Sequence, residues 1–268
     1  MNYVSALKNR GVALVSGLVG LSSCSVYVPM QGAAPEIRHR GELEVAGSWA
    51  LTKRVEVGAT YSPLNHLLVR AATSTKPDPH APADSTSYAQ VNQYELAVGT
   101  YWPLGPHWLV GGLAGFGQAH AEAQYDNDGS TILHFGYYDP VKHRIDAIYS
   151  KYSGEVYATW QPSPVVSTGL SYRLVQLRLT DATDQGLPVR SGPILRSEPM
   201  FFFRVRPGAG GASPGVVQLQ AAFGFSTTLG YDERRTDDAA DPARQFKLGR
   251  SYISLGVAVF PHLWWQKK

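Results

Sequence analysis

Apolar and polar side chains alternate with a period of two over most of the chain. The pattern is clearest over residues 216–227 and 251–260, and it recurs over 42–51, 54–61 and 91–102. Successive side chains of a β-strand point to opposite faces, so this period indicates strands with one apolar and one polar face. Helical spacing is not sustained anywhere after residue 23. The sequence therefore predicts an all-β chain.

The alternation, together with the turn residues between its segments, predicts ten strands. They are expected at 40–51, 54–61, 66–74, 89–102, 107–123, 146–161, 165–180, 195–206, 215–228 and 250–260. Every second connection is short to moderate and rich in turn residues, whereas four of the other five are long and polar. Single-chain outer-membrane barrels combine an even strand number with short periplasmic turns and long external loops. We therefore expect an antiparallel up-and-down transmembrane β-barrel with a periplasmic N-terminus.

Aromatic side chains gather at the expected strand ends. Those beside the expected periplasmic turns include Tyr61, Trp102, Trp108, Trp160 and Phe260. Amphipathic rings favour the interface between lipid and water. The preference of aromatic residues for strands explains their number but not their positions. These five residues are therefore expected to form an interface belt.

The polar faces of the expected strands carry charges of both signs. The residues expected to point into the lumen are Glu42, Glu44, Arg54, Glu56, Glu95, Arg173, Arg178, Arg196, Glu198 and Arg204. A barrel of ten strands is close in size to small barrels filled with side chains, and far from porins of about 16 to 18 strands. Because an unpaired buried charge is very costly, we expect these side chains to pair across the lumen. A narrow pore or a ligand niche is the alternative.

Residues 1–23 have the layout of an export signal. Lys8 and Arg10 precede an uncharged run of 11 residues, Gly11 to Leu21. This run is too short for a membrane helix of about 20 residues, but it fits the apolar region of a signal peptide, expected as a helix. Leu21-Ser22-Ser23-Cys24 follows, with the only cysteine of the chain.

The Leu21–Cys24 segment resembles the lipobox of bacterial lipoproteins. The resemblance implies cleavage before Cys24, a diacylglyceryl group on its thiol and a fatty acyl chain, such as palmitate, on the new amine. An ordinary signal-peptidase site with a coincidental cysteine is the alternative. Residues 24–38 are then expected to be a tether, in which Pro29 and Pro35 disfavour regular structure, and residues 39–268 to form the barrel.

Composition and charge exclude several other classes of protein. Charged residues make up 17% of the chain, against about 25% in a typical soluble domain. One cysteine excludes an intrachain disulfide framework and a zinc site built from several thiolates. The formal net charge is +3, and without residues 1–23 it falls to +1, with 22 basic and 21 acidic residues. That charge is too small to indicate nucleic-acid binding.

The mature chain resembles outer-membrane β-barrel lipoproteins, in particular uncharacterised barrel lipoproteins of Bacteroidota-type bacteria. The resemblance rests on the lipobox, on His39-Arg40-Gly41-Glu42-Leu43-Glu44 and on Tyr94-Glu95-Leu96-Ala97-Val98-Gly99-Thr100-Tyr101. It implies an outer-membrane location, with membrane lipid and the outer-membrane insertion machinery as partners. In one departure from such proteins, which often end on an aromatic residue, Phe260 is followed by PHLWWQKK.

Catalytic motifs are weak. His134, Asp139, His143 and Asp146 lie around one expected external loop, where solvated side chains are the simpler interpretation. Gly211-Ala212-Ser213-Pro214-Gly215 matches GxSxG by letter, but Pro214 lacks the N–H group that a nucleophile elbow requires after its serine. The eight histidines form no HExxH motif. We expect no catalysis, no metal site and no cofactor.

These observations predict a lipid-anchored outer-membrane barrel with a structural, surface-contact or small-solute role. A soluble periplasmic barrel lipoprotein that binds an apolar ligand is the second hypothesis, and a barrel enzyme acting on lipid or peptide is the third. The direction of the apolar faces separates the first two. In a membrane barrel Ile253, Leu255 and Val257 face outward, whereas in a soluble barrel they face inward.

Overall fold

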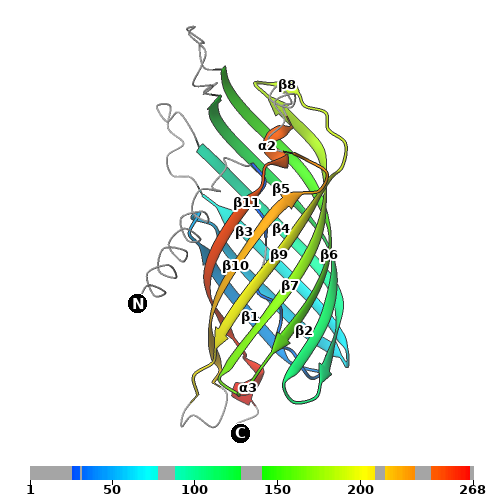
Figure 1. Ribbon diagram of the computed structural model, residues 1–268, viewed down its shortest axis with the longest axis vertical. Helices are drawn as coiled ribbons and strands as arrows, with labels where there is room; N and C mark the ends of the chain where they lie inside the picture. Colours follow the sequence, from blue (N-terminus) through cyan, green and yellow to red (C-terminus); the bar gives the residue numbers. More distant parts are fainter. Residues whose placement is uncertain are drawn as a thin grey trace, which may run out of the picture.

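The structure, a computed structural model, describes residues 26–30, 32–77, 88–127, 141–208, 215–232 and 243–265. Ten long antiparallel strands form a closed barrel (Figure 1). They are β1 (Leu43–Ala50), β2 (Val55–Leu64), β3 (Leu67–Lys76), β4 (Tyr88–Leu104), β5 (Trp108–Asn127), β6 (Val141–Trp160), β7 (Val166–Asp184), β9 (Ile194–Val205), β10 (Val217–Thr228) and β11 (Arg250–Val259). Two short helices, α2 (Arg244–Lys247) and α3 (His262–Trp265), and a two-residue strand, β8 (Leu187–Pro188), complete the described elements. Among the described residues no helix is long and apolar enough to cross a membrane.

Each long strand pairs with its neighbours along the chain, and β11 pairs with β1 to close the barrel. The short strand β8 pairs only with the end of β7, so it adds a small hairpin and no further strand to the wall. The predicted fold class, an all-β antiparallel up-and-down barrel of ten strands, is confirmed.

The two ends of the barrel differ. One end, called here the turn end, holds the connections β2–β3, β4–β5, β6–β7 and β9–β10, the start of β1, and α3 (Figure 1). The opposite end, called the loop end, holds the turn between β1 and β2, the strand ends from which the connections β3–β4, β5–β6 and β10–β11 leave, the connection β7–β9 with β8, and α2. Gly105, which joins β4 to β5 at the turn end, has a φ of 67°, a conformation that glycine adopts without steric cost.

The outer face of the barrel wall is apolar. Ile253, Leu255 and Val257 point outward and are 47%, 55% and 42% exposed. The side chains between them, such as Ser254 and Ala258, are buried in the interior. This arrangement is that of strands with lipid outside and a polar lumen inside. It contradicts the soluble alternative, in which the same apolar side chains would fill the core.

Toward the loop end the pattern reverses, so that polar side chains face outward and apolar ones inward. On β5 and β6, His120, Glu122 and Asp146 are exposed, whereas Ala121 and Ile145 are buried. Both strands also run further than expected, because residues up to Asn127 on β5 pair with residues from Val141 on β6. The reversed part of the barrel has the outer surface of a water-soluble protein, so this hairpin extends beyond the apolar wall.

Candidate functional site

The lumen is occupied by the protein's own N-terminal segment. We call residues 26–30 and 32–38 the lumen segment; in agreement with Pro29 and Pro35, it forms neither helix nor strand. Six of its apolar side chains are at most 2% exposed: Val26, Tyr27, Val28, Met30, Ala34 and Ile37. The expectation of a free tether over 24–38 is corrected for these residues, because they are packed inside the barrel.

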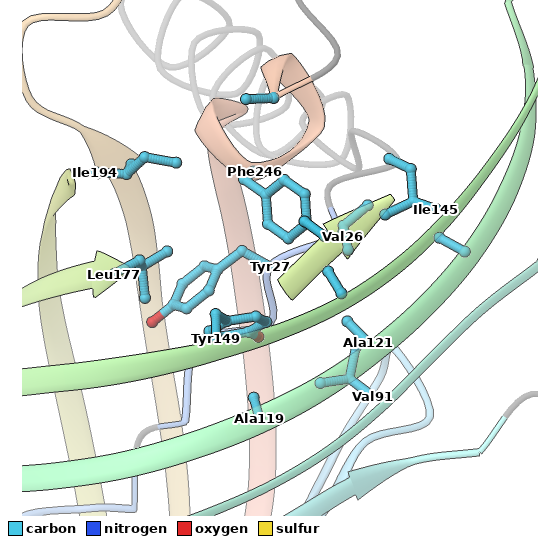
Figure 2. Packing of buried hydrophobic residues seen from close by; sticks show 14 of the residues in the cluster. Val26, Tyr27, Val91, Ala119, Ala121, Ile145, Tyr149, Leu177, Ile194 and Phe246 are labelled. Atoms are coloured by element: carbon cyan, nitrogen blue, oxygen red, sulfur yellow. The ribbon is translucent and has the colours of Figure 1, made fainter. Parts of the chain in front are cut away.

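At the loop end the lumen segment enters an apolar cluster. Tyr27 lies between Tyr149 and the residues of α2, and Val26 lies close to Phe246 (Figure 2). The ring centroids of Tyr27 and Tyr149 are 6.2 Å apart, and those of Tyr149 and Phe246 are 6.1 Å apart. The backbone N–H of Val26 donates to the carbonyl of Gln245 at 3.1 Å. This end of the segment is therefore fixed to both the wall and α2.

In the middle of the barrel the carbonyls of the lumen segment accept hydrogen bonds from side chains of the wall. Gln93 Nε2 donates to the Val28 carbonyl at 3.1 Å. Guanidinium groups of the wall donate to three further carbonyls, in the pairs Arg54–Pro29, Arg173–Met30 and Arg204–Ala34. An extended segment with no strand partner needs such donors, because unpaired backbone groups are costly to bury.

Glu36 is the charged contact of the lumen segment. Its Oε2 atom accepts hydrogen bonds from Arg206 Nη2 at 2.8 Å and from Gln218 Nε2 at 2.7 Å. Its Oε1 atom lies 3.4 Å from Arg204 Nη1 and also accepts from the Ser167 hydroxyl. One carboxylate of the segment thus joins β7, β9 and β10 near the turn end.

The last residues of the lumen segment lead directly into β1. The backbone N–H of Glu36 donates to Glu44 Oε2 at 2.8 Å, and that of Arg38 donates to Glu42 Oε2 at 2.7 Å. Both acceptor residues lie at or just before the start of β1. The segment therefore ends at the turn end, where the first strand begins.

Glu95 is the centre of a second charged cluster on the wall. Its carboxylate pairs with Arg173, lies 3.4 Å from Arg70 Nη2 and lies 4.0 Å from Lys151 Nζ. Arg70 also pairs with Glu155 at 2.8 Å. All five side chains are buried or nearly so. Their pairing fulfils the physical requirement that charge in a filled lumen be compensated.

Arg196, on β9, connects the wall at the loop end to the lumen segment and to α2. Its guanidinium donates to the Phe246 carbonyl at 2.7 Å and to the Leu248 carbonyl at 2.9 Å. The same group lies 4.5 Å from the ring centroid of Tyr27, which donates its hydroxyl hydrogen to Glu198 at 2.7 Å. Arg196 therefore holds Tyr27 and α2 together at the loop end.

Little free space remains in this part of the lumen. A cavity of about 30 Å³ lies between Met30 and Gly32 of the lumen segment and the side chains of Glu56, Glu95 and Arg173. One buried water needs roughly 10 to 15 Å³ by a comparable measure. The cavity can therefore hold about two or three waters, so the described lumen is narrow at the level of Met30 and Gly32.

The charges of the wall are not balanced without the lumen segment. The buried charged side chains of the strands and their ends, with the largely buried Arg70, give seven cations against five carboxylates, apart from Asp184, which is as little exposed as Arg70 and pairs with His143 at the loop end. The cations are Arg54, Arg70, Lys151, Arg173, Arg196, Arg204 and Arg206, and the carboxylates are Glu44, Glu56, Glu95, Glu155 and Glu198. Glu36 adds a sixth carboxylate, and three of the cations also donate to carbonyls of the segment.

Most charges expected in the lumen lie there. Eight of them are at most 4% exposed: Glu44, Arg54, Glu56, Glu95, Arg173, Arg196, Glu198 and Arg204. Glu42 lies half-buried just before β1, at the turn-end mouth. Arg70, Arg206 and Glu36 were not among the charges predicted in the lumen. Arg70 could have been found, because it alternates with Val69 and Ala71, but Glu36 precedes the first strand and has no periodicity to place it.

Arg178 is a correction, because it lies on the outer face and not in the lumen. It is exposed, and its guanidinium lies 5.5 Å from the ring centroid of Tyr152. Alternation along β7 is unbroken from Arg173 through Val175 to Leu177, which places Arg178 on the opposite face. The register of the β6–β7 pairing shifts only further along the chain, between Ile148 and Tyr149.

Of the five aromatic residues expected in the interface belt, four lie on the outer face and one lies inside the barrel. Tyr61, Trp102, Trp108 and Trp160 point outward at the turn end and are 42% to 50% exposed. Phe260 is a correction, because it is 1% exposed and lies inside the barrel, with the Arg206 guanidinium 3.5 Å from its ring centroid. It continues the inward phase of Tyr252, Ser254 and Ala258, which explains its direction.

Of the residues weighed for catalysis, His143 and Asp146 are among the described residues, and each lies beside a different partner. His143 Nδ1 lies 2.6 Å from Asp184 Oδ2, and Asp146 Oδ1 lies 2.9 Å from His120 Nε2 on the outer surface. His134, Asp139 and the residues 211–214 of the GxSxG match fall outside the described residues, as do Cys24 and residues 1–23. Within the described ranges, no group of three or more His, Cys, Asp and Glu side chains could hold a metal ion.

Comparisons with known proteins return structural similarity only. No family model matches the chain, and no curated protein matches it in sequence. Among solved structures, the chain is similar to the translocator domain of the autotransporter NalP from Neisseria meningitidis, with 11% identity, 96% coverage of each chain and a TM-score of 0.39. It is also similar to the NanC porin (11% identity, 81% of this chain and 98% of the other, TM-score 0.37). A third similar structure is the outer-membrane protease OmpT from Escherichia coli (10% identity, 82% and 93% coverage, TM-score 0.39). The barrel assignment itself rests on the strand pairing of this chain.

Proposed function

We propose that the protein is a lipid-anchored outer-membrane β-barrel that is closed by its own N-terminal segment and has a non-catalytic, surface-contact role. The observation that carries this proposal is the occupied lumen. Residues 26–30 and 32–38 occupy it, and the cavity beside Met30 and Gly32 is about 30 Å³, whereas a wider cavity of about 490 Å³ lies at the turn-end mouth beside Glu36, Arg206 and Phe260. A closed barrel offers its surroundings the connections at the loop end, and these are the proposed contact surface.

The distribution of side chains supports the membrane part of the proposal. Outward-facing apolar residues cover the wall from the turn end to the middle of the barrel, and four aromatic residues lie on the outer face at the turn end. Above them, His120, Glu122 and Asp146 give β5 and β6 a polar outer surface. An apolar band bordered by aromatic rings is typical of outer-membrane barrels. The lipid anchor at Cys24 is proposed from the lipobox resemblance alone.

Conductance across a planar lipid bilayer tests the closed lumen. The full mature chain is expected to add no steady conductance, because the lumen segment fills the path. Removing residues 26–38 and joining Ser25 to His39 is expected to produce open channels that favour anions, because seven cations then face five carboxylates. Steady conductance by the full chain, equal to that of the shortened chain, would contradict the proposal.

Two controls accompany this measurement. Heat-modifiable mobility on a gel shows whether the shortened chain still forms a barrel. If it does not, Glu36→Lys replaces the deletion, since a cation beside Arg204 and Arg206 repels the lumen segment without shortening it. This variant is expected to show intermittent openings, and a silent variant with normal barrel mobility on the gel would count against Glu36 as a contact that holds the lumen segment in place.

A further inference from the structure

The lumen segment has its two ends at opposite ends of the barrel. Its first described residue, Val26, donates its N–H to Gln245 of α2 at the loop end. Its last residue, Arg38, donates its N–H to Glu42 at the turn end, immediately before β1. The chain therefore passes down the lumen before β1 turns back up in the wall (Figure 1).

The segment is long enough to cross the apolar part of the wall completely. Thirteen residues in an extended conformation reach about 40 Å, at roughly 3.3 Å per residue. The apolar band of an outer-membrane barrel is about 25 Å tall. Burial of both ends, at Val26 and at Ile37, agrees with a segment that occupies the lumen over its full height.

The loop end is the external end of the barrel by the usual rule for outer-membrane proteins. Short turns lie in the periplasm and long connections outside, and here the short turns lie beside the start of β1 and α3. The reversed pattern at the loop end agrees with this orientation, because a polar outer surface on β5 and β6 suits the aqueous exterior. The first strand therefore begins on the periplasmic side, whereas Val26, at the start of the lumen segment, lies at the external end of the barrel.

We propose that the N-terminus of the mature chain is displayed on the external surface, so that a lipid on Cys24 inserts in the outer leaflet of the membrane. Cys24 is two residues before Val26, and two residues span about 7 Å at most. The lumen below Val26 is filled by Tyr27 and Val28, which leaves no room there for a second passage of the chain. The inference rests on the proposed lipid anchor and specifies the side of the outer membrane on which that anchor lies. It replaces the periplasmic N-terminus expected from the parity of the strands.

Antibody access on intact cells tests this topology. An eight-residue epitope is inserted between Ser25 and Val26, which leaves Leu21–Cys24 unchanged and the lumen segment complete. The same epitope is inserted beside Leu187 at the loop end and beside Pro106 at the turn end as controls. The proposal predicts that the first two are bound on intact cells and that the third is bound only after the outer membrane is permeabilised. Binding of the first epitope only after permeabilisation would overturn it.

Acyl labelling of the same cells separates the lipid from the topology. Incorporation of radiolabelled palmitate that is lost in Cys24→Ala, together with an accessible epitope, supports an external anchor. An accessible epitope without acyl labelling would overturn the proposed lipid anchor but leave the threading intact. If the epitope disturbs folding, as judged by heat-modifiable mobility, Ser25→Cys in a Cys24→Ser chain with a general export signal replaces it. A membrane-impermeant maleimide is then expected to label intact cells, and labelling only after permeabilisation would contradict the proposal.

Discussion

Replacing Glu95 by glutamine is expected to lower the free energy of unfolding by about 3 to 5 kcal/mol, the usual loss when one partner of a buried ion pair is removed. Glu95 faces three cations, Arg70, Lys151 and Arg173. Without the charge of Glu95, Lys151 and Arg173 lose the only ion-pair partner that they have among the described residues. Arg70 keeps its pair with Glu155. Urea titration of tryptophan fluorescence in lipid vesicles measures the change.

The matched control for Glu95→Gln is Glu122→Gln on the neighbouring strand. Glu122 is 42% exposed at its side chain and lies 3.7 Å from an equally exposed His120. Exposed pairs contribute about 0 to 1 kcal/mol, so this variant is expected to unfold almost like the parent protein. Equal unfolding curves for the two variants would contradict a buried, paired lumen.

Replacing Val98 by arginine is expected to destabilise the barrel in a bilayer by about 2 to 4 kcal/mol, as for a charge facing lipid near the midplane. Val98 is 53% exposed on the outer face of β4 and lies midway between Tyr94 and Trp102, which face the same way. Leu187→Arg is the control, because Leu187 is 71% exposed in β8, in the connection between β7 and β9. The same vesicle titration is used for both variants.

The two variants discriminate sharply between a membrane and a soluble barrel. In water, arginine at an exposed position costs little, and most surface substitutions stay within about 0.5 kcal/mol. A soluble barrel would therefore tolerate Val98→Arg as well as Leu187→Arg. Equal stability of the two variants in vesicles would remove the proposed lipid contact of the wall.

The sequence was sufficient for the wall because the alternation of side chains is a local signal. Ile253, Leu255 and Val257 reveal their common face by spacing alone, and Arg204 and Glu198 reveal the opposite face. Such spacing predicts the face of the sheet that a side chain occupies only as long as the alternation is uninterrupted. Arg178 was misplaced, because the alternation continues unbroken from Arg173 through Leu177 and puts Arg178 on the outer face.

The lumen segment could not be predicted in the same way. An irregular segment makes contacts that depend on where the closed wall places Arg54, Arg173 and Arg204, and no local pattern records those positions. Two prolines indicated irregular structure over 24–38 but not its location. The paired extension of β5 and β6 was missed for a related reason, because its outer face is polar where that of the wall below is apolar.

Thiol protection at Ala34 tests the occupied lumen most directly. Ala34 is 0% exposed, and its carbonyl accepts a hydrogen bond from Arg204. Ala34→Cys is prepared in a Cys24→Ala chain, with Leu187→Cys in the same background as an exposed control, and the rate of maleimide reaction is measured in folded and urea-unfolded protein. We expect the thiol at position 34 to be protected in the folded barrel and reactive after unfolding, with position 187 reactive in both states. Reaction at position 34 in the folded barrel as fast as at position 187 would contradict the account.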